Sequence, residues 1–398
     1  MRRLALVSVL ALSLAAPAAA ETVKVGLILP FSGGAAEFGQ QIERGMLLFQ
    51  KKNPAAFGGH SIQLIKHDTQ GPSADTAKTG AQEALTREGA SLLAGFVFSP
   101  QAIAVAPLAS QAKTPMIVMN AATSWIPSLS PYMARVSFTM WQAGSLMGRY
   151  AAEKLACKTA VVGYTDYPPG KDSLEAFQRA YEEKGGKLVE ALPMAGPQDV
   201  PDFTPFLQRV KDARPSCFYA FVPSGNHLSA LVKTYANLGM REAGIKLIGP
   251  GELVQDTMLP SMDKAAAGMI TAFHYAADYD TPANKAFVEA WKQEYGAGAI
   301  PDFMAVAGWD GMALIAHLAK TGNGKIEGDK AMQAIRGWKF ESPRGPIVID
   351  AETRDIVHNE TIQELVLKDG RLVNRVLETY PQVKDPCKEA KVGKCATW

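Results

Sequence analysis

The sequence lacks the residue patterns that most metal proteins and many enzymes need. Its 4 cysteines and 6 histidines are scattered, and none of them pair at C-x-x-C or H-x-x-x-H spacing, so no zinc site is expected. There is no G-x-S-x-G nucleophile elbow, and "GYTDYPPGKD" has the wrong spacing for a phosphate-binding loop. We therefore expect a protein that is not an enzyme and that holds no metal and no cofactor.

Strong charge of one sign is also absent. The 41 lysines and arginines nearly balance the 39 acidic residues, which leaves a formal net charge of +2. A charge this small gives no reason to expect a nucleic acid partner. Beyond the first twenty residues, no hydrophobic run reaches the length that is needed to span a membrane.

The first twenty residues have the pattern of a secretory signal peptide. Arg2 and Arg3 form a positive start, an apolar run that is too short to cross a bilayer follows, and small residues end at Ala20. We expect residues 1–20 to be removed and the mature protein to be a soluble periplasmic protein. A twin-arginine signal is the weaker alternative, because only the arginine pair fits it.

Export makes disulfides possible, and four cysteines allow three pairings. We favour Cys387–Cys395, which would close a small loop in the polar tail. Cys157 and Cys217 each precede a strand of the same expected lobe. They are equally consistent with a second disulfide and with two reduced, buried side chains.

The remaining chain is longer than one compact core usually holds, and its pattern alternates between strand and helix. The expected strands of a first series are 23–30, 61–68, 91–98 and 115–119, and those of a second are 159–165, 187–194, 217–222 and 245–250. Such alternation predicts two α/β lobes with mostly parallel sheets. Two late strands with an Asp369-Gly370 hairpin turn are expected near the C-terminus.

In open α/β sheets, ligands bind beyond the carboxyl ends of the strands. Ser99 and Pro100 follow an expected strand and fit the start of a helix, whose free N–H groups attract a carboxylate. The alternative is that Ser99 only caps its own helix. Thr123 follows the next strand and can exchange hydrogen bonds with a ligand, while Ala121 leaves room for one, although an ordinary loop has the same composition.

Aromatic residues near these strand ends are candidates for the walls of a pocket. Trp125 and Trp141 could contact an apolar or aromatic ligand, and the alternative for both is packing in the core or between the lobes. Tyr167 is a candidate wall from the second lobe, on a loop that Pro168 and Pro169 make stiff.

Several motifs, in order along nearly the whole mature chain, resemble those of one family. They are "VKVGLILPFSGGAAEFGQQIERGMLLF", "GFVFSPQAIAVAP", "MNAAT" and "DYPPGKDSLEAF". This series resembles the periplasmic substrate-binding proteins of ABC importers, of the branched-chain amino acid (Leu/Ile/Val-binding) type. The resemblance implies a type I periplasmic binding fold, in which two Rossmann-like lobes are joined by a three-crossover hinge. It implies lobe 1 at 21–139 and 271–349, and lobe 2 at 140–270 and 350–398.

The resemblance also implies a binding site. Ser99 and Thr123 match the side chains that hold a ligand carboxylate, and Ala121 matches a residue whose backbone contributes there. Phe38 falls where the family often has a tyrosine near the ligand. Glu252, or Gly251 if the alignment shifts by one residue, falls near the acid that holds an α-ammonium group.

Two positions depart from the family's amino-acid binders. Pro169 falls where they commonly carry a tyrosine, and Met140 replaces a common polar residue. We therefore expect a monomeric solute-binding protein that delivers a small carboxylate to an ABC permease. The carboxylate is either a hydrophobic or branched-chain amino acid or an aromatic acid. The alternative is a periplasmic sensor that presents its bound state to a receptor.

Overall fold

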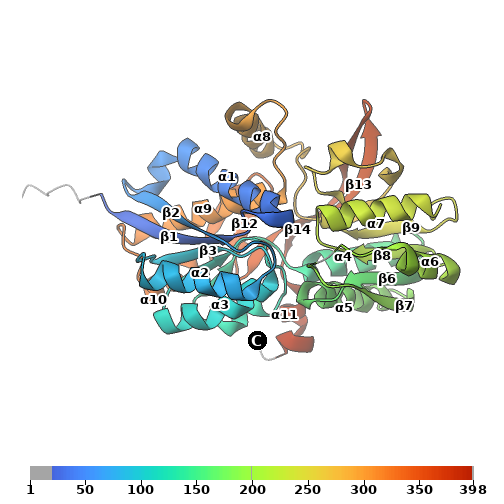
Figure 1. The fold of residues 1–398 in the computed structure, drawn as a ribbon, viewed down its shortest axis with the longest axis horizontal. Helices are drawn as coiled ribbons and strands as arrows, with labels where there is room; N and C mark the ends of the chain where they lie inside the picture. Colours follow the sequence, from blue (N-terminus) through green and yellow to red (C-terminus); the bar gives the residue numbers. More distant parts are fainter. Residues whose placement is uncertain (1–19, 199, 397–398) are drawn as a thin grey trace, which may run out of the picture.

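A computed structural model describes residues 20–198 and 200–396 of the chain. The chain forms two α/β lobes that lie side by side (Figure 1). Nearly all of the predicted signal peptide lies outside the described residues. None of the described helices is both long and apolar enough to cross a membrane.

Lobe 1 is built around a parallel sheet with the strand order β2-β1-β3-β4-β5. Its strands are β1 (Thr22–Leu29), β2 (Ser61–Asp68), β3 (Leu92–Gly95), β4 (Met116–Val118) and β5 (Met133–Arg135). Its helices are α1 (Ala36–Lys52), α2 (Ala74–Thr86), α3 (Ser99–Ala112), α8 (Pro282–Tyr295), α9 (Phe303–Thr321) and α10 (Gly328–Ile335). One face of α1, which includes Ile42 and Met46, is buried in the core.

Lobe 2 repeats this arrangement with the parallel order β7-β6-β8-β9-β10. Its strands are β6 (Thr159–Thr165), β7 (Lys187–Met194), β8 (Cys217–Phe221), β9 (Lys246–Pro250) and β10 (Ile270–Phe273). Its helices are α4 (Met140–Glu153), α5 (Pro168–Glu182), α6 (Thr204–Ala213) and α7 (Asn226–Asn237). The prediction of an α/β protein with two similar, parallel-rich lobes is therefore confirmed.

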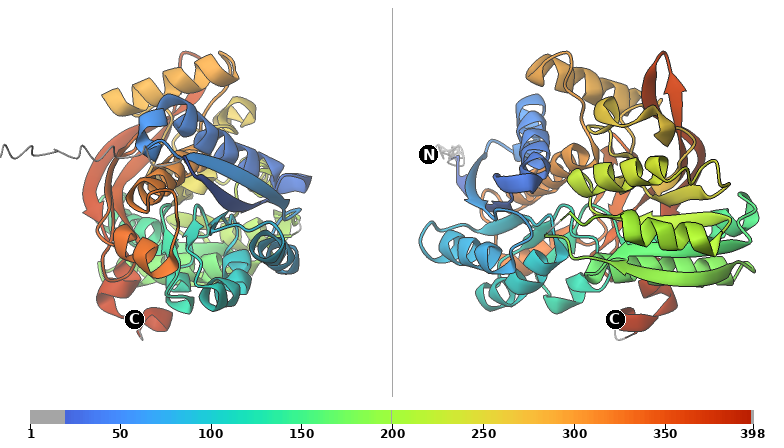
Figure 2. Two further views of the ribbon diagram at one scale, coloured as in Figure 1. Left: turned by 90° about the vertical axis from the view of Figure 1, so that its left-hand side faces the viewer. Right: turned by 45° about the vertical axis from the view of Figure 1, so that its right-hand side comes forward.

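The late strands run from lobe 1 into the second sheet. They are β11 (Lys339–Ser342), β12 (Gly345–Ile349), β13 (Ile356–Lys368) and β14 (Arg371–Val383), followed by the short helix α11 (Pro386–Ala390). β13 is antiparallel to β12, β10 and β14. Asp369 and Gly370 both have positive φ at the turn between β13 and β14, which confirms the predicted hairpin. The C-terminal segment lies along one edge of the molecule (Figure 2).

The lobe boundary expected between residues 270 and 271 needs a correction. It would divide β10, whose residues Ile270, Thr271 and Ala272 pair in parallel with β9 of lobe 2. The chain therefore leaves the second sheet only after Phe273. The other two connections run from β5 to α4 and from β12 to β13. Periodicity identifies a strand but not the sheet that it joins, so this boundary could not be placed from the pattern alone.

Both disulfides form. The favoured pair Cys387–Cys395 is bridged, and so is Cys157–Cys217, for which the sequence left the reduced alternative open. Cys157 lies just before β6 and Cys217 begins β8, and these two strands are hydrogen-bonded neighbours. The second bridge therefore ties together adjacent strands of the lobe 2 sheet.

Candidate functional site

The candidate site lies between the lobes, at the point in each sheet where the strand order reverses. In each lobe the strand order reverses at one point, between β1 and β3 in lobe 1 and between β6 and β8 in lobe 2, and ligands bind at such switch points. A small cavity of about 30 Å³ lies there, lined from both lobes. Its lining residues are Phe38, Val97, Phe98, Asn120, Phe303 and Met304 of lobe 1, and Tyr167, Phe221, Pro223, Ser224 and Glu252 of lobe 2.

Two glycines bring an aromatic residue of each lobe to this cavity. A Cβ atom on Gly39 would lie 1.9 Å from the carbonyl oxygen of Pro30, and a Cβ on Gly170 would lie 1.9 Å from that of Thr165. Only glycine permits such an approach of a helix to the end of the preceding strand. Phe38, beside Gly39, and Tyr167, at the N-terminus of α5, are thereby held at the cleft.

The walls of the cavity are largely aromatic. The ring centroids of Phe38 and Phe98 are 6.4 Å apart, and those of Tyr167 and Phe221 are 6.0 Å apart in a stacked arrangement. The Phe38 ring also reaches lobe 2, where its Cζ would be 3.7 Å from a Cβ built on Gly225. Rings on both sides favour a flat, apolar ligand body between the lobes.

The loop before α3 differs from the sequence expectation. Helix α3 begins at Ser99, and the N-cap position is Phe98, so Ser99 does not cap its own helix. The Ser99 Oγ instead accepts a hydrogen bond of 3.2 Å from the backbone N–H of Thr123. Because Ser99 is the acceptor in this bond, its own hydroxyl hydrogen is not used there.

Arg135 shapes the neighbouring loop after β4. Its Nη1 donates to the carbonyl oxygens of Ala121 and Thr123, both at 2.8 Å, and its Nε donates to Asp355 at 2.7 Å. The Ala121 N–H donates to the carbonyl of Phe96 at 2.9 Å. The Ala121 N–H and carbonyl are therefore both used in hydrogen bonds that hold the loop. In this arrangement neither group is free to make the bond to a ligand that the resemblance implies.

The structure brings Ser99 and Thr123 together at adjacent strand ends. Both are completely buried, and the Thr123 Oγ1 has no hydrogen-bond partner within the described residues. Neither residue lines the cavity, although Phe98 and Asn120, just before them in the chain, do. The pair could donate two hydroxyl hydrogens to a ligand oxygen, and this role remains a prediction.

Glu252 lies at the cavity, in a 3-10 turn (Gly251–Val254) that follows β9. Its neighbour Gly251, the alternative alignment, is packed so closely that an added Cβ would lie 2.2 Å from Phe273. Burial raises the pKa of the Glu252 carboxyl to about 8. Burial, with a smaller contribution from Glu252, also raises the pKa of the Tyr167 hydroxyl above its usual value.

The buried carboxyl of Glu252 makes stability depend on pH. Its pKa rises from 4.5 to about 8 on folding, so the folded protein binds more protons and stability falls as pH rises between these values. Glu252→Gln carries no charge at this position. We expect the difference in unfolding free energy between this variant and the wild type to grow in favour of the variant by about 2 kcal/mol from pH 6 to pH 7.5. Urea unfolding of both proteins at the two pH values measures this. An equal difference at both would show that Glu252 does not titrate in this way.

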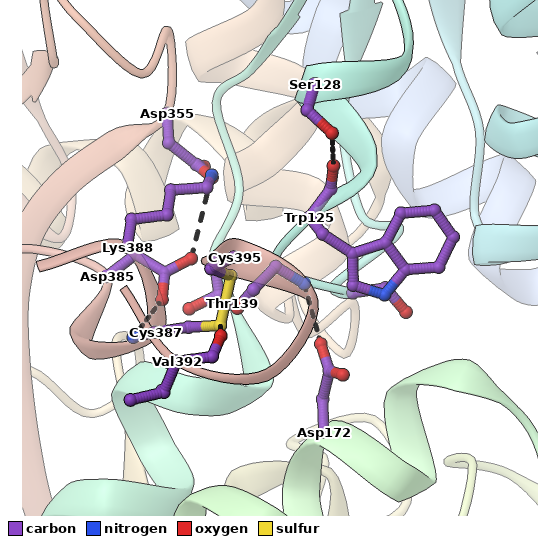
Figure 3. Close-up of a disulfide and its surroundings, with 12 residues drawn as sticks. Trp125, Ser128, Thr139, Asp172, Asp355, Asp385, Cys387, Lys388, Val392 and Cys395 are labelled. Atoms are coloured by element: carbon purple, nitrogen blue, oxygen red, sulfur yellow. Dashed lines mark hydrogen bonds and ion pairs between the residues drawn. A yellow bond between two sulfur atoms is a disulfide. The ribbon is translucent and has the colours of Figure 1, made fainter. Parts of the chain in front are cut away.

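Trp125 does not lie where the sequence suggested that it could. Trp125 packs against the cluster that contains the Cys387–Cys395 disulfide, and Figure 3 shows both in one region. The Nζ of Lys394 lies 4.5 Å from the Trp125 ring centroid. Trp125 is absent from the cavity lining. Trp141, also considered as a wall, is buried in the same cluster. The packing alternative holds for both residues, because the C-terminal tail covers this edge of the lobes.

Arg344 joins the connections between the lobes. Its guanidinium donates to the carbonyl oxygens of Val136 and Ser137 in the first connection and, at 3.1 Å, to the Nδ1 of His274 in the second. It also pairs with the buried carboxylate of Asp310 at 2.9 Å. Burial and this guanidinium hold the pKa of His274 well below its usual value, so the imidazole is neutral and accepts the bond.

Sequence reasoning missed several lining residues. Asn120 lies in the MNAAT motif and Ser224 follows the end of β8, but neither side chain was singled out from the sequence. Phe303 and Met304 begin α9, which returns to lobe 1 only after the chain has passed through lobe 2, so no local signal points to them. Among the described residues, no group of three or more His, Cys, Asp or Glu side chains could hold a metal ion.

Known sequences match this chain over most of its length. A sequence profile of the family described as "Periplasmic binding protein" matches residues 22–371. The chain is 39% identical over 390 residues to the Leu/Ile/Val-binding protein homolog 6 of Brucella abortus (strain 2308), covering 97% of this chain and 99% of that protein.

Solved structures give similar folds. One is a solute-binding protein of an ABC transporter from Rhodopseudomonas palustris BisB5, in complex with 3,4-dihydroxybenzoic acid. It is 43% identical, with a TM-score of 0.87, and the match covers 92% of this chain and 99% of that chain. Another is a solute-binding protein from R. palustris in complex with 4-hydroxybenzoate, at 36% identity and a TM-score of 0.88, with the same coverage.

Proposed function

Because this chain belongs to the periplasmic binding protein family and is a solute-binding component of an ABC import system, we propose that the small carboxylate it captures is an aromatic acid. The observation that carries this proposal is the pairing of aromatic walls from both lobes. Phe38 and Phe98 face the cavity from lobe 1, and Tyr167 and Phe221 face it from lobe 2. The benzoates bound by two similar proteins support the same ligand class.

The carboxylate would be held by Ser99 and Thr123. The Thr123 Oγ1 is buried without a partner in the described chain, and the Ser99 hydroxyl hydrogen is not used in its bond to Thr123. Both residues adjoin the N-terminus of α3, where backbone N–H groups and the helix dipole favour an anion. The hydroxyl pair would donate hydrogen bonds to the ligand's charged end, while the rings contact its body.

Ligand entry requires the lobes to separate. The cavity of about 30 Å³ is far below the roughly 300–1,000 Å³ of typical small-molecule pockets. The described structure is therefore a closed arrangement, in which Ser124 of lobe 1 donates its N–H to the Asp172 carboxylate of lobe 2 at 2.7 Å. In this proposal the protein acts as a monomer without catalysis, follows export through a cleaved signal peptide, and passes its ligand to membrane permease subunits.

A hydrophobic amino acid is the second candidate. Glu252 is the observation that favours it, because a carboxyl at the cavity could accept hydrogen bonds from an α-ammonium group. Pro169 and Met140, which stand where the sequence resemblance expects a tyrosine and a polar residue, weigh against it.

A thermal-unfolding screen separates the two candidates. Leucine, phenylalanine, benzoate, 4-hydroxybenzoate and a hydroxycinnamate are each added to the mature protein at increasing concentration. A ligand at a hundred times its dissociation constant should stabilise by about 2.7 kcal/mol. We expect stabilisation by the aromatic acids and none by leucine. Stabilisation by leucine alone would replace the aromatic acid with the amino acid, and no shift with any carboxylate would contradict the proposed function.

A further inference from the structure

Two residues that line the cavity each carry a buried acceptor atom without a partner in the described residues. The atoms are the Oδ1 of Asn120, from the end of β4 in lobe 1, and the Oε2 of Glu252, from the turn after β9 in lobe 2. The orientation of the Asn120 amide is set by its Nδ2, which donates to the carbonyl of Val97 at 2.8 Å. The amide oxygen is therefore the atom of this side chain that lacks a hydrogen-bond partner.

Such atoms are costly to leave unpaired, since a buried acceptor that has lost its water needs a donor. Glu252 is only 7% exposed. The nearby hydroxyl of Ser224 does not satisfy its carboxyl, because that hydroxyl donates to the backbone carbonyl of Glu252 at 3.2 Å. A ligand that fills this part of the cleft must supply hydrogen-bond donors.

The position of these acceptors decides which donors fit. An α-amino acid carries its ammonium and carboxylate on the same carbon atom, so its donor must lie next to the Ser99–Thr123 pair. That pair does not line the cavity that Asn120 and Glu252 share. A benzoate carries meta and para substituents across the ring from its carboxylate, and the cavity walls between the lobes are aromatic.

We propose that Asn120 and Glu252 form a subsite that recognises ring hydroxyls. It accepts hydrogen bonds from the meta and para hydroxyls of the bound benzoate. This rests on the proposed function, since it assumes a benzoate whose carboxylate is held at Ser99 and Thr123. Each acceptor takes one hydrogen bond, and a 3,4-dihydroxybenzoate carries two hydroxyls, one for each acceptor. Because the acceptors belong to different lobes, the ring hydroxyls also bridge the closed cleft.

Calorimetric titration of the wild-type protein tests the ligand side. We expect 4-hydroxybenzoate, 3-hydroxybenzoate and 3,4-dihydroxybenzoate to bind about 10-fold to 100-fold more tightly than benzoate. Two compounds are controls that should gain nothing. 4-Methoxybenzoate has no donor, and the hydroxyl of 2-hydroxybenzoate donates to its own carboxylate. Equal or tighter binding of benzoate or 4-methoxybenzoate would overturn the subsite.

Variants test the protein side through the ratio of the dissociation constants of benzoate and the hydroxybenzoates. In Glu252→Ala and in Asn120→Ala, at least one of 3-hydroxybenzoate and 4-hydroxybenzoate should bind no more than about threefold more tightly than benzoate. Glu252→Gln keeps an acceptor oxygen and should restore most of the ratio. Glu289→Ala, on the exposed side of α8, is the matched control and should leave every constant unchanged.

The outcomes separate the subsite from the function on which it rests. A ratio that stays at its wild-type value in both alanine variants would overturn the subsite while benzoate binding, and with it the proposed function, remains. Binding of leucine that is lost in Glu252→Ala would instead show that Glu252 reads an ammonium group. Failure of all benzoates to bind the wild-type protein would overturn both.

Discussion

Replacing Ser99 with alanine and Thr123 with valine in the same protein is expected to weaken binding of 4-hydroxybenzoate by about 10²-fold to 10⁴-fold. Each hydroxyl would donate one hydrogen bond to the ligand carboxylate, and a bond to a charged group contributes about 1.5–3 kcal/mol. Both residues are completely buried, so water would not replace the lost donors. Calorimetric titration at neutral pH measures the change.

The control for this double variant is Thr86→Val, on the exposed part of α2, where the lost hydroxyl bonds only to the carbonyl of Gln82. It should bind as the wild type does. Because Ser99 also accepts from the Thr123 N–H, the thermal midpoint of the double variant must be measured beside its affinity. Unchanged affinity in a folded double variant would show that the carboxylate is held elsewhere.

Replacing Arg344 with methionine is expected to lower the free energy of unfolding by about 3–5 kcal/mol, because removing one partner leaves a buried charge uncompensated. The lost guanidinium pairs with Asp310, and neither side chain is exposed. The carbonyls of Val136 and Ser137 in the first connection would lose their donor as well. The variant should therefore disturb the hinge more than any single surface change.

Urea unfolding tests this expectation against two comparisons. Arg87→Met removes an exposed pair with Glu83 and should cost no more than about 0.5 kcal/mol. Adding Asp310→Leu to Arg344→Met removes the orphaned carboxylate and should recover part of the loss. A loss below about 1 kcal/mol in Arg344→Met would contradict the role assigned to this residue.

Much of the fold could be predicted because buried parallel strands and amphipathic helices leave clear periodic patterns. The stretch from Val23 to Met119 shows this, since each expected strand falls on an observed one. The β10 strand shows the limit. Its residues read as a strand, but only its register with β9 shows which lobe it joins. That choice depends on contacts between distant segments, which a local pattern does not contain.

The site could be predicted where it is formed by strand ends. Phe38, Tyr167 and Glu252 follow the first, sixth and ninth strands and lie at the cavity. Tyr167 is a candidate because ligands bind at such strand ends, whereas Phe38 and Glu252 come from the resemblance to the family. Trp125 follows a strand too, but the C-terminal tail covers it through the Cys387–Cys395 loop. A covering segment more than two hundred residues away in sequence cannot be foreseen from the residues beside Trp125.

The crystal structure of the protein with bound 4-hydroxybenzoate is the most direct test of the central claim. The account predicts one ligand in the inter-lobe cleft, with its carboxylate within hydrogen-bond distance of the Ser99 and Thr123 hydroxyls. Its ring would lie between Phe38 and Tyr167. A ligand bound outside the cleft, or one whose carboxylate contacts neither hydroxyl, would contradict the account.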